Sequence, residues 1–168
     1  MSTTIPTTLP AGTWRLTPET SVALTVKKLK VITVNATVAF TNGTVEVGED
    51  GSVTGVHATM DASSFASGND KRDEHVRSDD FLATDQHGAI AFESSAVTGD
   101  RIDGQLTIKG QAYPVTLAVT DVAVDDTSGT FSASASIDRT AVGVAKMPAL
   151  VIAKMVDVRI AGHATLQD

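Results

Sequence analysis

A single stretch breaks the pattern of this sequence, and it reads Met60-Asp61-Ala62-Ser63-Ser64-Phe65-Ala66-Ser67-Gly68-Asn69-Asp70-Lys71-Arg72-Asp73-Glu74-His75-Val76-Arg77-Ser78-Asp79-Asp80-Phe81-Leu82. On both sides of it, apolar and polar residues alternate, as in strands that bury one face. Within it, Val76 is the only large apolar residue between Phe65 and Phe81. We therefore expect a polar excursion from a β-rich body, held at its ends by Phe65 and by Phe81-Leu82.

The excursion carries signals for a short helix within residues 61–83. Asp70 and Ser78 can each cap a helix, because their side-chain oxygens accept hydrogen bonds from free backbone N–H groups. Asp73 and Arg77 lie four residues apart, which on a helix makes a weak surface ion pair.

Strands are predicted on either side of the excursion. The alternating apolar faces lie in residues 22–26, 34–40, 45–47 and 56–60 before it, and in residues 90–92, 102–108, 115–119, 131–137 and 156–166 after it. Asn42-Gly43 predicts a hairpin turn, because both residues tolerate positive φ. Glu49-Asp50-Gly51, Gly99-Asp100 and the segment 125–129 predict further turns.

These segments predict one all-β domain. About eight short antiparallel strands in a chain of 168 residues favour a closed barrel, although a β-sandwich would show the same alternation. We expect this domain to cover residues 13–168 and to follow a flexible segment, rich in Thr and Pro, over residues 1–12.

The composition limits the partners. Twenty acidic and thirteen basic residues give a formal net charge of -7, which argues against nucleic acid and against an anionic membrane surface. Without cysteine, disulfides and thiolate chemistry are excluded. No run is long enough for stable membrane insertion, and the amino terminus lacks the basic and apolar regions of a signal peptide. We therefore expect a cytoplasmic protein.

The excursion also resembles the signature of the YceI-type family of lipocalin-like, polyisoprenoid-binding proteins. The matching positions are Asp61, Ser64, Gly68-Asn69, Arg72-Asp73, His75, Asp80-Phe81 and Phe92-Glu93-Ser94. Later segments are similar too, namely Leu106-Thr107-Ile108-Lys109-Gly110, Pro114-Val115-Thr116-Leu117 and Ile137-Asp138-Arg139 with Gly143. The resemblance covers almost the whole chain. It implies a lipocalin-like barrel, a polyisoprenoid or isoprenoid quinone as ligand, and a fold compatible with a homodimer; many relatives in that family are exported.

Several positions depart from the family pattern. Where the family has His, Phe and His in an early strand, this chain has Thr20, Leu24 and Lys28. Ala36 and Val38 replace Gly and Phe in the next strand, and Val142 replaces a late Phe. Interior aromatic and histidine side chains are therefore fewer than the pattern implies.

The small interior residues predict a cavity. A closed barrel lined by Val and Ala, in a chain with 4 % aromatic residues, need not fill itself, and a dry apolar cavity accepts an apolar guest. We therefore predict a protein that binds, sequesters or carries a long apolar lipid. The predicted pocket lining comprises Leu24, Val26, Val38, Phe40, Met60, Phe65, Phe81, Ile90, Phe92, Leu106, Ile108, Leu117, Phe131, Ala133, Ala135, Ile137, Val142, Met147 and Leu150.

Two other classes of function stay open. An enzyme acting on a hydrophobic intermediate would use Arg72, Asp73 and His75 near the pocket mouth. An interaction module would have a β-sandwich with a full core. We favour a structural role for the signature residues Asp61, Ser64, Asn69, Arg72, Asp73, His75, Asp138 and Arg139, which would hold the excursion by charge-assisted hydrogen bonds.

No metal or other cofactor is predicted. His57, His75, His87 and His163 are too scattered in the sequence for a ligand set, and no nucleophile, phosphate-loop or dinucleotide motif occurs. Should the ligand carry an anionic head group, the candidate contacts are Lys28, Lys109 and Arg139.

Overall fold

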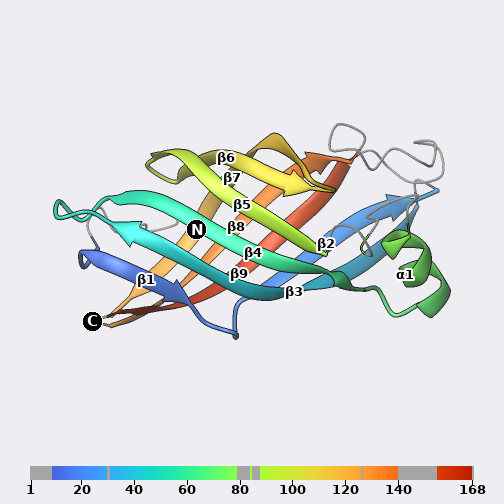
Figure 1. The fold of residues 1–168 in the computed structure, drawn as a ribbon, viewed down its shortest axis with the longest axis horizontal. Helices are drawn as coiled ribbons and strands as arrows, with labels where there is room; N and C mark the ends of the chain where they lie inside the picture. Colours follow the sequence, from blue (N-terminus) through green and yellow to red (C-terminus); the bar gives the residue numbers. More distant parts are fainter. Residues whose placement is uncertain are drawn as a thin grey trace.

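The computed structural model describes residues 9–29, 31–78, 84, 88–125, 127–139 and 155–167. These residues form nine strands and one helix (Figure 1). The elements are β1 (Gly12–Leu16), β2 (Ser21–Lys28), β3 (Ile32–Val47), β4 (Val53–Ala66), α1 (Asp70–Arg77), β5 (Ala89–Thr98), β6 (Arg101–Ile108), β7 (Gln111–Val124), β8 (Ser128–Asp138) and β9 (Met155–Leu166).

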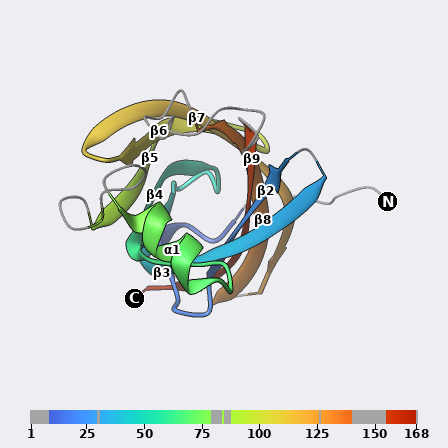
Figure 2. The same cartoon turned by 90° about the vertical axis from the view of Figure 1, so that its right-hand side faces the viewer.

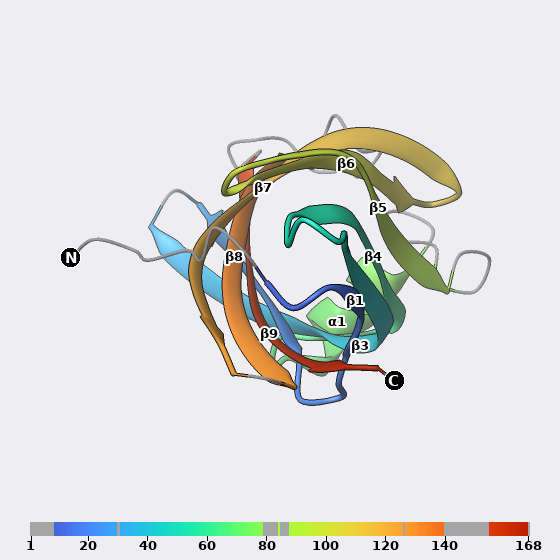
Figure 3. The same ribbon diagram turned by 90° about the vertical axis from the view of Figure 1, so that its left-hand side faces the viewer.

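The strands close into a single barrel (Figure 3). Each strand from β2 to β8 pairs antiparallel with the next strand in the chain, and β9 pairs back with β2 to close the ring. The result is a single-domain, eight-stranded antiparallel barrel, which confirms the predicted fold class. A closed sheet has no free edge, unlike the two sheets of a sandwich.

The nine strands make an eight-stranded barrel because β1 and β2 occupy the same position, one after the other, between β3 and β9. β2 pairs with the first half of β3, as in Val22↔Val38, whereas β1 pairs with its second half, as in Trp14↔Val45. Both also pair with β9. Between them, the buried hydroxyl of Thr20 donates to the His163 carbonyl (3.2 Å) and accepts from the His163 N–H (3.1 Å). A side chain thus substitutes for ladder bonds at the break.

The predicted hairpin at Asn42-Gly43 is wrong, because β3 runs through both residues without interruption and neither has positive φ. The turn comes later, at Gly48–Ser52, where Gly51 has a φ of 83°. Gly43 serves close packing instead: a Cβ there would lie 2.7 Å from Leu16 Cδ1 and 2.8 Å from the His57 carbonyl oxygen.

The predicted start of the excursion is also wrong, since residues 61–66 continue β4 and the chain leaves the strand only at Ser67. The polar residues here belong to a bulge. Ala66 pairs with Thr37 but Asp61 pairs with Ala39, so β4 carries extra residues. The Ser64 hydroxyl accepts from the Ala39 N–H (2.7 Å) and donates to the Asp61 carbonyl, so its side chain hydrogen-bonds two backbone groups at the bend.

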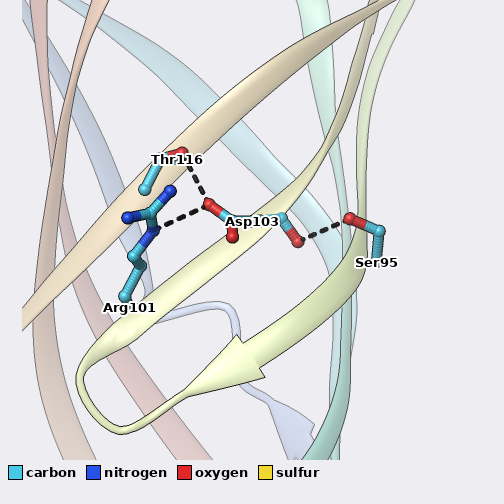
Figure 4. Close-up of polar contacts among 4 residues, drawn as sticks. All are labelled: Ser95, Arg101, Asp103 and Thr116. Carbon is cyan, nitrogen blue, oxygen red and sulfur yellow. Dashed lines mark hydrogen bonds and ion pairs between the residues drawn. The ribbon is translucent and has the colours of Figure 1, made fainter.

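A second bulge, between Ser94 and Ala96, is stabilised in a similar way on β5 (Figure 4). The Ser95 hydroxyl donates to the Asp103 carbonyl (3.2 Å). The Asp103 carboxylate accepts from Thr116 (2.7 Å) and from Arg101 (3.0 Å), and these hydrogen bonds hold its pKa below the ordinary value. The cluster joins β5, β6 and β7 at the solvent-exposed surface of the barrel.

The role of Gly43 can be tested by Gly43→Ala. The new methyl group meets a backbone oxygen that cannot move aside, so we expect a destabilisation of about 1–3 kcal/mol, as in other overpacked sites. Thermal unfolding measures it. Gly55→Ala in β4 is the matched control, because its Cβ would lie 3.8 Å from the nearest neighbour, the Ser94 hydroxyl oxygen. Equal melting temperatures for the two variants would contradict the packing role.

Candidate functional site

The barrel encloses a cavity of about 640 Å³. Its wall is formed by the inward-facing residues of the strands and by one side of α1. The wall includes small side chains, among them Val34, Ala36, Val38, Ala133 and Ala135. The interior therefore stays open because these residues are too short to meet across it.

The wall contains many of the residues proposed from the sequence. They are Leu24, Val26, Val38, Phe40, Met60, Phe65, Ile90, Phe92, Leu106, Ile108, Leu117, Phe131, Ala133, Ala135 and Ile137. Phe81, Val142, Met147 and Leu150 lie outside the described residues, as do Asp80, Leu82, Gly143 and His87. Contact of this lining with a ligand stays a prediction.

Sequence reasoning missed other parts of the wall. Val22, Val56 and Ile160 line the cavity in phase with the residues that were named, so the same alternation could have found them. Leu9, Trp14 and Leu16 come from the N-terminal segment and β1. Leu9 falls in the segment predicted to be flexible, and its N–H donates to the Gly51 carbonyl (2.9 Å).

The two ends of the cavity differ in chemistry. At one end, Trp14, Leu16, Val47 and Ala164 form a buried apolar cluster, and the Trp14 indole N–H is satisfied by the Pro10 carbonyl (3.0 Å). At the other end, α1 lies across the barrel (Figure 2). The polar lining residues of that end are Asn69, Lys71, Arg72, His75 and Arg139. Among the described lining residues there is no acidic side chain.

Helix α1 begins one residue earlier than predicted. Asn69, not Asp70, is the N-cap, and its side-chain oxygen accepts from the Arg72 N–H (3.0 Å). Ser78 ends the helix, since its N–H donates to the His75 carbonyl (3.1 Å) and its hydroxyl donates to the same oxygen. The Asn residue of the signature therefore starts the helix that covers the polar end.

The predicted surface pair between Asp73 and Arg77 is wrong, because Asp73 is only 3 % exposed. Its carboxylate accepts from the Ser67 N–H (2.9 and 3.0 Å) and from the Ser67 hydroxyl. Arg72 binds the same residue, with Nε on the hydroxyl (2.8 Å) and a terminal nitrogen on the carbonyl (3.0 Å). Ser67, which sequence reasoning missed, thus joins both charged residues to the end of β4.

The charge of Asp73 is stabilised by this network. Burial opposes ionisation, but the hydrogen bonds from the side chain and backbone of Ser67 outweigh it, with help from the charges of Arg72 and Arg77. The pKa of Asp73 consequently lies below its ordinary value of 3.8. Arg72 and Asp73 in this way connect α1 to Ser67 at the end of β4, and a purely structural role for them stays a prediction.

Arg139 is the buried cation of the wall, with an exposed fraction of 5 %. Burial lowers the pKa of its guanidinium, and the negative charge of Asp138 opposes that effect. Of the other candidate contacts for an anionic head group, Lys109 lies in the turn between β6 and β7 and is not part of the cavity wall. The side chain of Lys28 is outside the described part of the structure.

The three histidines in the described part of the chain lie on different elements. His57 is exposed on β4, His75 lines the helix end of the cavity, and His163 lies beside Glu19 (3.4 Å) near the start of β2. Within the described ranges, no group of three His, Asp or Glu side chains could hold a metal ion. No helix in those ranges has the length and apolar character needed to cross a bilayer.

Comparison with known proteins places the chain in a family. Residues 14–164 match the family model of the YceI-like domain. The chain belongs to the YceI-like family. A UPF0312 protein of Staphylococcus aureus is 47 % identical over 53 residues (32 % of this chain, 31 % of the relative), and one of Ectopseudomonas mendocina is 40 % identical over 68 residues (38 % and 36 %). The chain thus spans about a third of the length of these relatives.

Solved structures show the YceI-like fold more completely. Burkholderia cenocepacia BcnA is similar at a TM-score of 0.75 and 24 % identity, covering 89 % of this chain and 97 % of that protein. A polyisoprenoid binding domain from Saccharophagus degradans is similar at 0.67 and 13 % identity, covering 92 % and 98 %. At these identities the likeness concerns the fold.

The network at Ser67 predicts a pH-dependent contribution of Asp73 to stability. Its folded-state pKa is depressed, so the contribution is fully present above the ordinary value of 3.8 and is lost as pH falls below it. We expect Asp73→Asn to lower the stability by about 1–3 kcal/mol near neutral pH and to differ less from the wild type in acid. Melting curves across pH measure this.

Glu74→Gln is the matched control, because Glu74 is the next residue of α1 and is exposed. It should melt like the wild type near neutral pH. A stability difference between Asp73→Asn and the wild type that stayed constant into acid would contradict the role of the ionised carboxylate.

Proposed function

We propose that this YceI-like protein binds one long apolar lipid chain in its barrel and carries it without changing it chemically. The observation that carries the proposal is the cavity of about 640 Å³ inside the barrel, with an almost entirely aliphatic and aromatic wall. Ligand pockets usually measure about 300–1,000 Å³. The finer proposal is a polyisoprenoid or isoprenoid quinone, and the similarity to the polyisoprenoid binding domain of Saccharophagus degradans supports a polyisoprenoid.

Burial of the chain is sufficient for affinity. Each buried CH₂ contributes about 0.8 kcal/mol, so a long chain binds without a charged contact or a catalytic group. The same physics makes selection by length weak, since one methylene separates two ligands by about 1–3 kcal/mol. The protein should therefore accept a set of related chains.

The two ends of the cavity give the ligand a direction. The apolar cluster around Trp14 suits the end of a hydrocarbon tail. The end below α1 offers Asn69, Lys71, His75 and Arg139, which suit the polar head of an amphiphile. We propose that the tail enters first and that the head stays beside α1.

The alternative hypothesis, an enzyme acting on a hydrophobic intermediate, would require a chemical reaction on the bound ligand. It would place the acid or base at His75, because His75 lines the cavity whereas Asp73 does not. A reaction on a prenyl substrate that disappears in His75→Ala, with folding intact, would favour an enzyme over a carrier.

The cavity can be tested by Ala135→Phe. Ala135 lies on the wall and is 9 % exposed, so the added ring should occupy space meant for the lipid. We expect a melting temperature within about 2 °C of the wild type and the loss of co-purifying lipid, measured by native mass spectrometry.

Ser134→Phe is the matched control, since it adds the same ring to the adjacent residue of β8, which is not part of the cavity wall. It should retain the lipid. A sharp fall in melting temperature for Ala135→Phe, with the lipid unaffected, would mean that the interior is packed and that the carrier hypothesis fails.

Salt distinguishes apolar from charge-led binding. For a neutral prenyl ligand, the dissociation constant should hardly change between low and moderate salt, because screening acts only on charges. Fluorescence titration with a prenyl analogue measures it. A steep loss of affinity with added salt would instead indicate an anionic head group bound at Arg139 or Lys71.

A further inference from the structure

The most exposed large apolar side chains gather at the helix end of the barrel. Over the part of the chain that the structure describes, they are Leu29 (51 % exposed), Val31 (80 %), Ile32 (48 %) and Met155 (48 %). Leu29 and Val31 belong to the connection between β2 and β3, and Ile32 is the first residue of β3. Met155 starts the neighbouring strand β9, two residues before Asp157, which pairs with Thr25 of β2.

The backbone conformation at Leu29 is strained. Its φ is 51°, in the left-handed region that a bulky side chain seldom adopts and that Asn or Gly would adopt more easily. A strained, exposed leucine contributes little to the fold. Such strain tends to persist where the displayed side chain has a use.

The β2–β3 segment carries a charge opposite to that of the protein as a whole, although Asp138 of β8 pairs with Met155. The protein has a net charge of -7, yet no acidic residue occurs between Glu19 and Glu46, and lysines occupy positions 27, 28 and 30. Lys27 is exposed, and its ammonium group donates to the Thr33 hydroxyl (2.5 Å). Apolar tips flanked by lysine suit a surface that is apolar inside and anionic outside.

This surface adjoins the cavity. Val26 and Val34 pair with each other and both line the wall, whereas Lys28 and Ile32, two residues further along each strand, form the last pair before the connection. Met155 likewise precedes Val156 of the wall. The exposed tip is thus the outward continuation of the lipid-facing strands.

We propose that Lys27, Leu29, Val31 and Ile32, together with Met155, form a docking tip by which the protein rests on an anionic lipid bilayer. The tip would place the helix end of the cavity against the membrane, where a lipid chain can pass between the two. The docking follows from the surface itself; its use in lipid exchange rests on the proposed function. The acidic remainder of the protein keeps the contact shallow and reversible.

Vesicle flotation tests the tip, with vesicles of phosphatidylglycerol and phosphatidylcholine against vesicles of phosphatidylcholine alone. The wild type should float with the anionic vesicles only. Leu29→Asn removes the apolar side chain and suits the positive φ, so it should keep or raise the melting temperature and weaken vesicle binding about tenfold. Val31→Ser should weaken it without altering the turn.

Two charge-reversal variants test whether the positive charge of Lys27 contributes to vesicle binding. Lys27→Glu and Arg15→Glu make the same change on exposed strand residues at opposite ends of the barrel. Only Lys27→Glu should reduce flotation, by about tenfold. Equal flotation for Lys27→Glu and Arg15→Glu, or undiminished flotation for Leu29→Asn, would overturn the proposal.

Native mass spectrometry and light scattering on the same preparations separate the remaining outcomes. A wild type that carries lipid but ignores vesicles would refute the docking tip and leave the proposed function intact. A wild type that floats with the vesicles but carries no lipid would support the docking tip and refute the proposed function. A wild-type dimer that becomes a monomer in Leu29→Asn would show that a second copy of the chain covers the tip, and the proposal would fail.

Discussion

The whole structure depends on the pairing that closes the sheet. β9 holds β2 along its first residues and β1 along its last ones, and β3 holds the same two strands from the other side. Because the barrel is closed, its circumference is fixed by the number and tilt of its strands and not by the size of its side chains. Short residues such as Ala36 and Ala133 therefore leave space that the sheet cannot collapse to fill.

The sequence allowed the strands and their inward faces to be predicted, because a half-buried strand repeats every two residues. The sequence-based predictions were wrong where a local composition typical of a turn or loop occurs at a residue that a tertiary contact requires. Asn42-Gly43 has the composition of a tight turn, but the glycine is needed where β3 passes close to Leu16 and His57. Asp61 to Ala66 look like a loop because a bulge places polar side chains on backbone groups. Neither contact is visible to a local pattern, since its partners lie far away in the chain.

For the site, family resemblance located the excursion but not its chemistry. Sequence reasoning placed Asp73 on the surface, whereas the fold buries it against Ser67, six residues earlier. Serine is common and gives no signal of such a role. The polar end of the cavity was equally hidden, because Lys71 and Arg139 meet the same space from α1 and from the residue after β8.

The sharing of one barrel position by β1 and β2 also sets the order of events during synthesis. Both strands need residues 155–166 as a neighbour, so the ring cannot close until that segment has left the ribosome. Until then β2 and β8 each lack a partner along one edge, and the sequence separation of these contacts makes closure slow. The nascent chain therefore passes through an open, edge-exposed sheet, and the cavity exists only once β9 has paired with β1, β2 and β8.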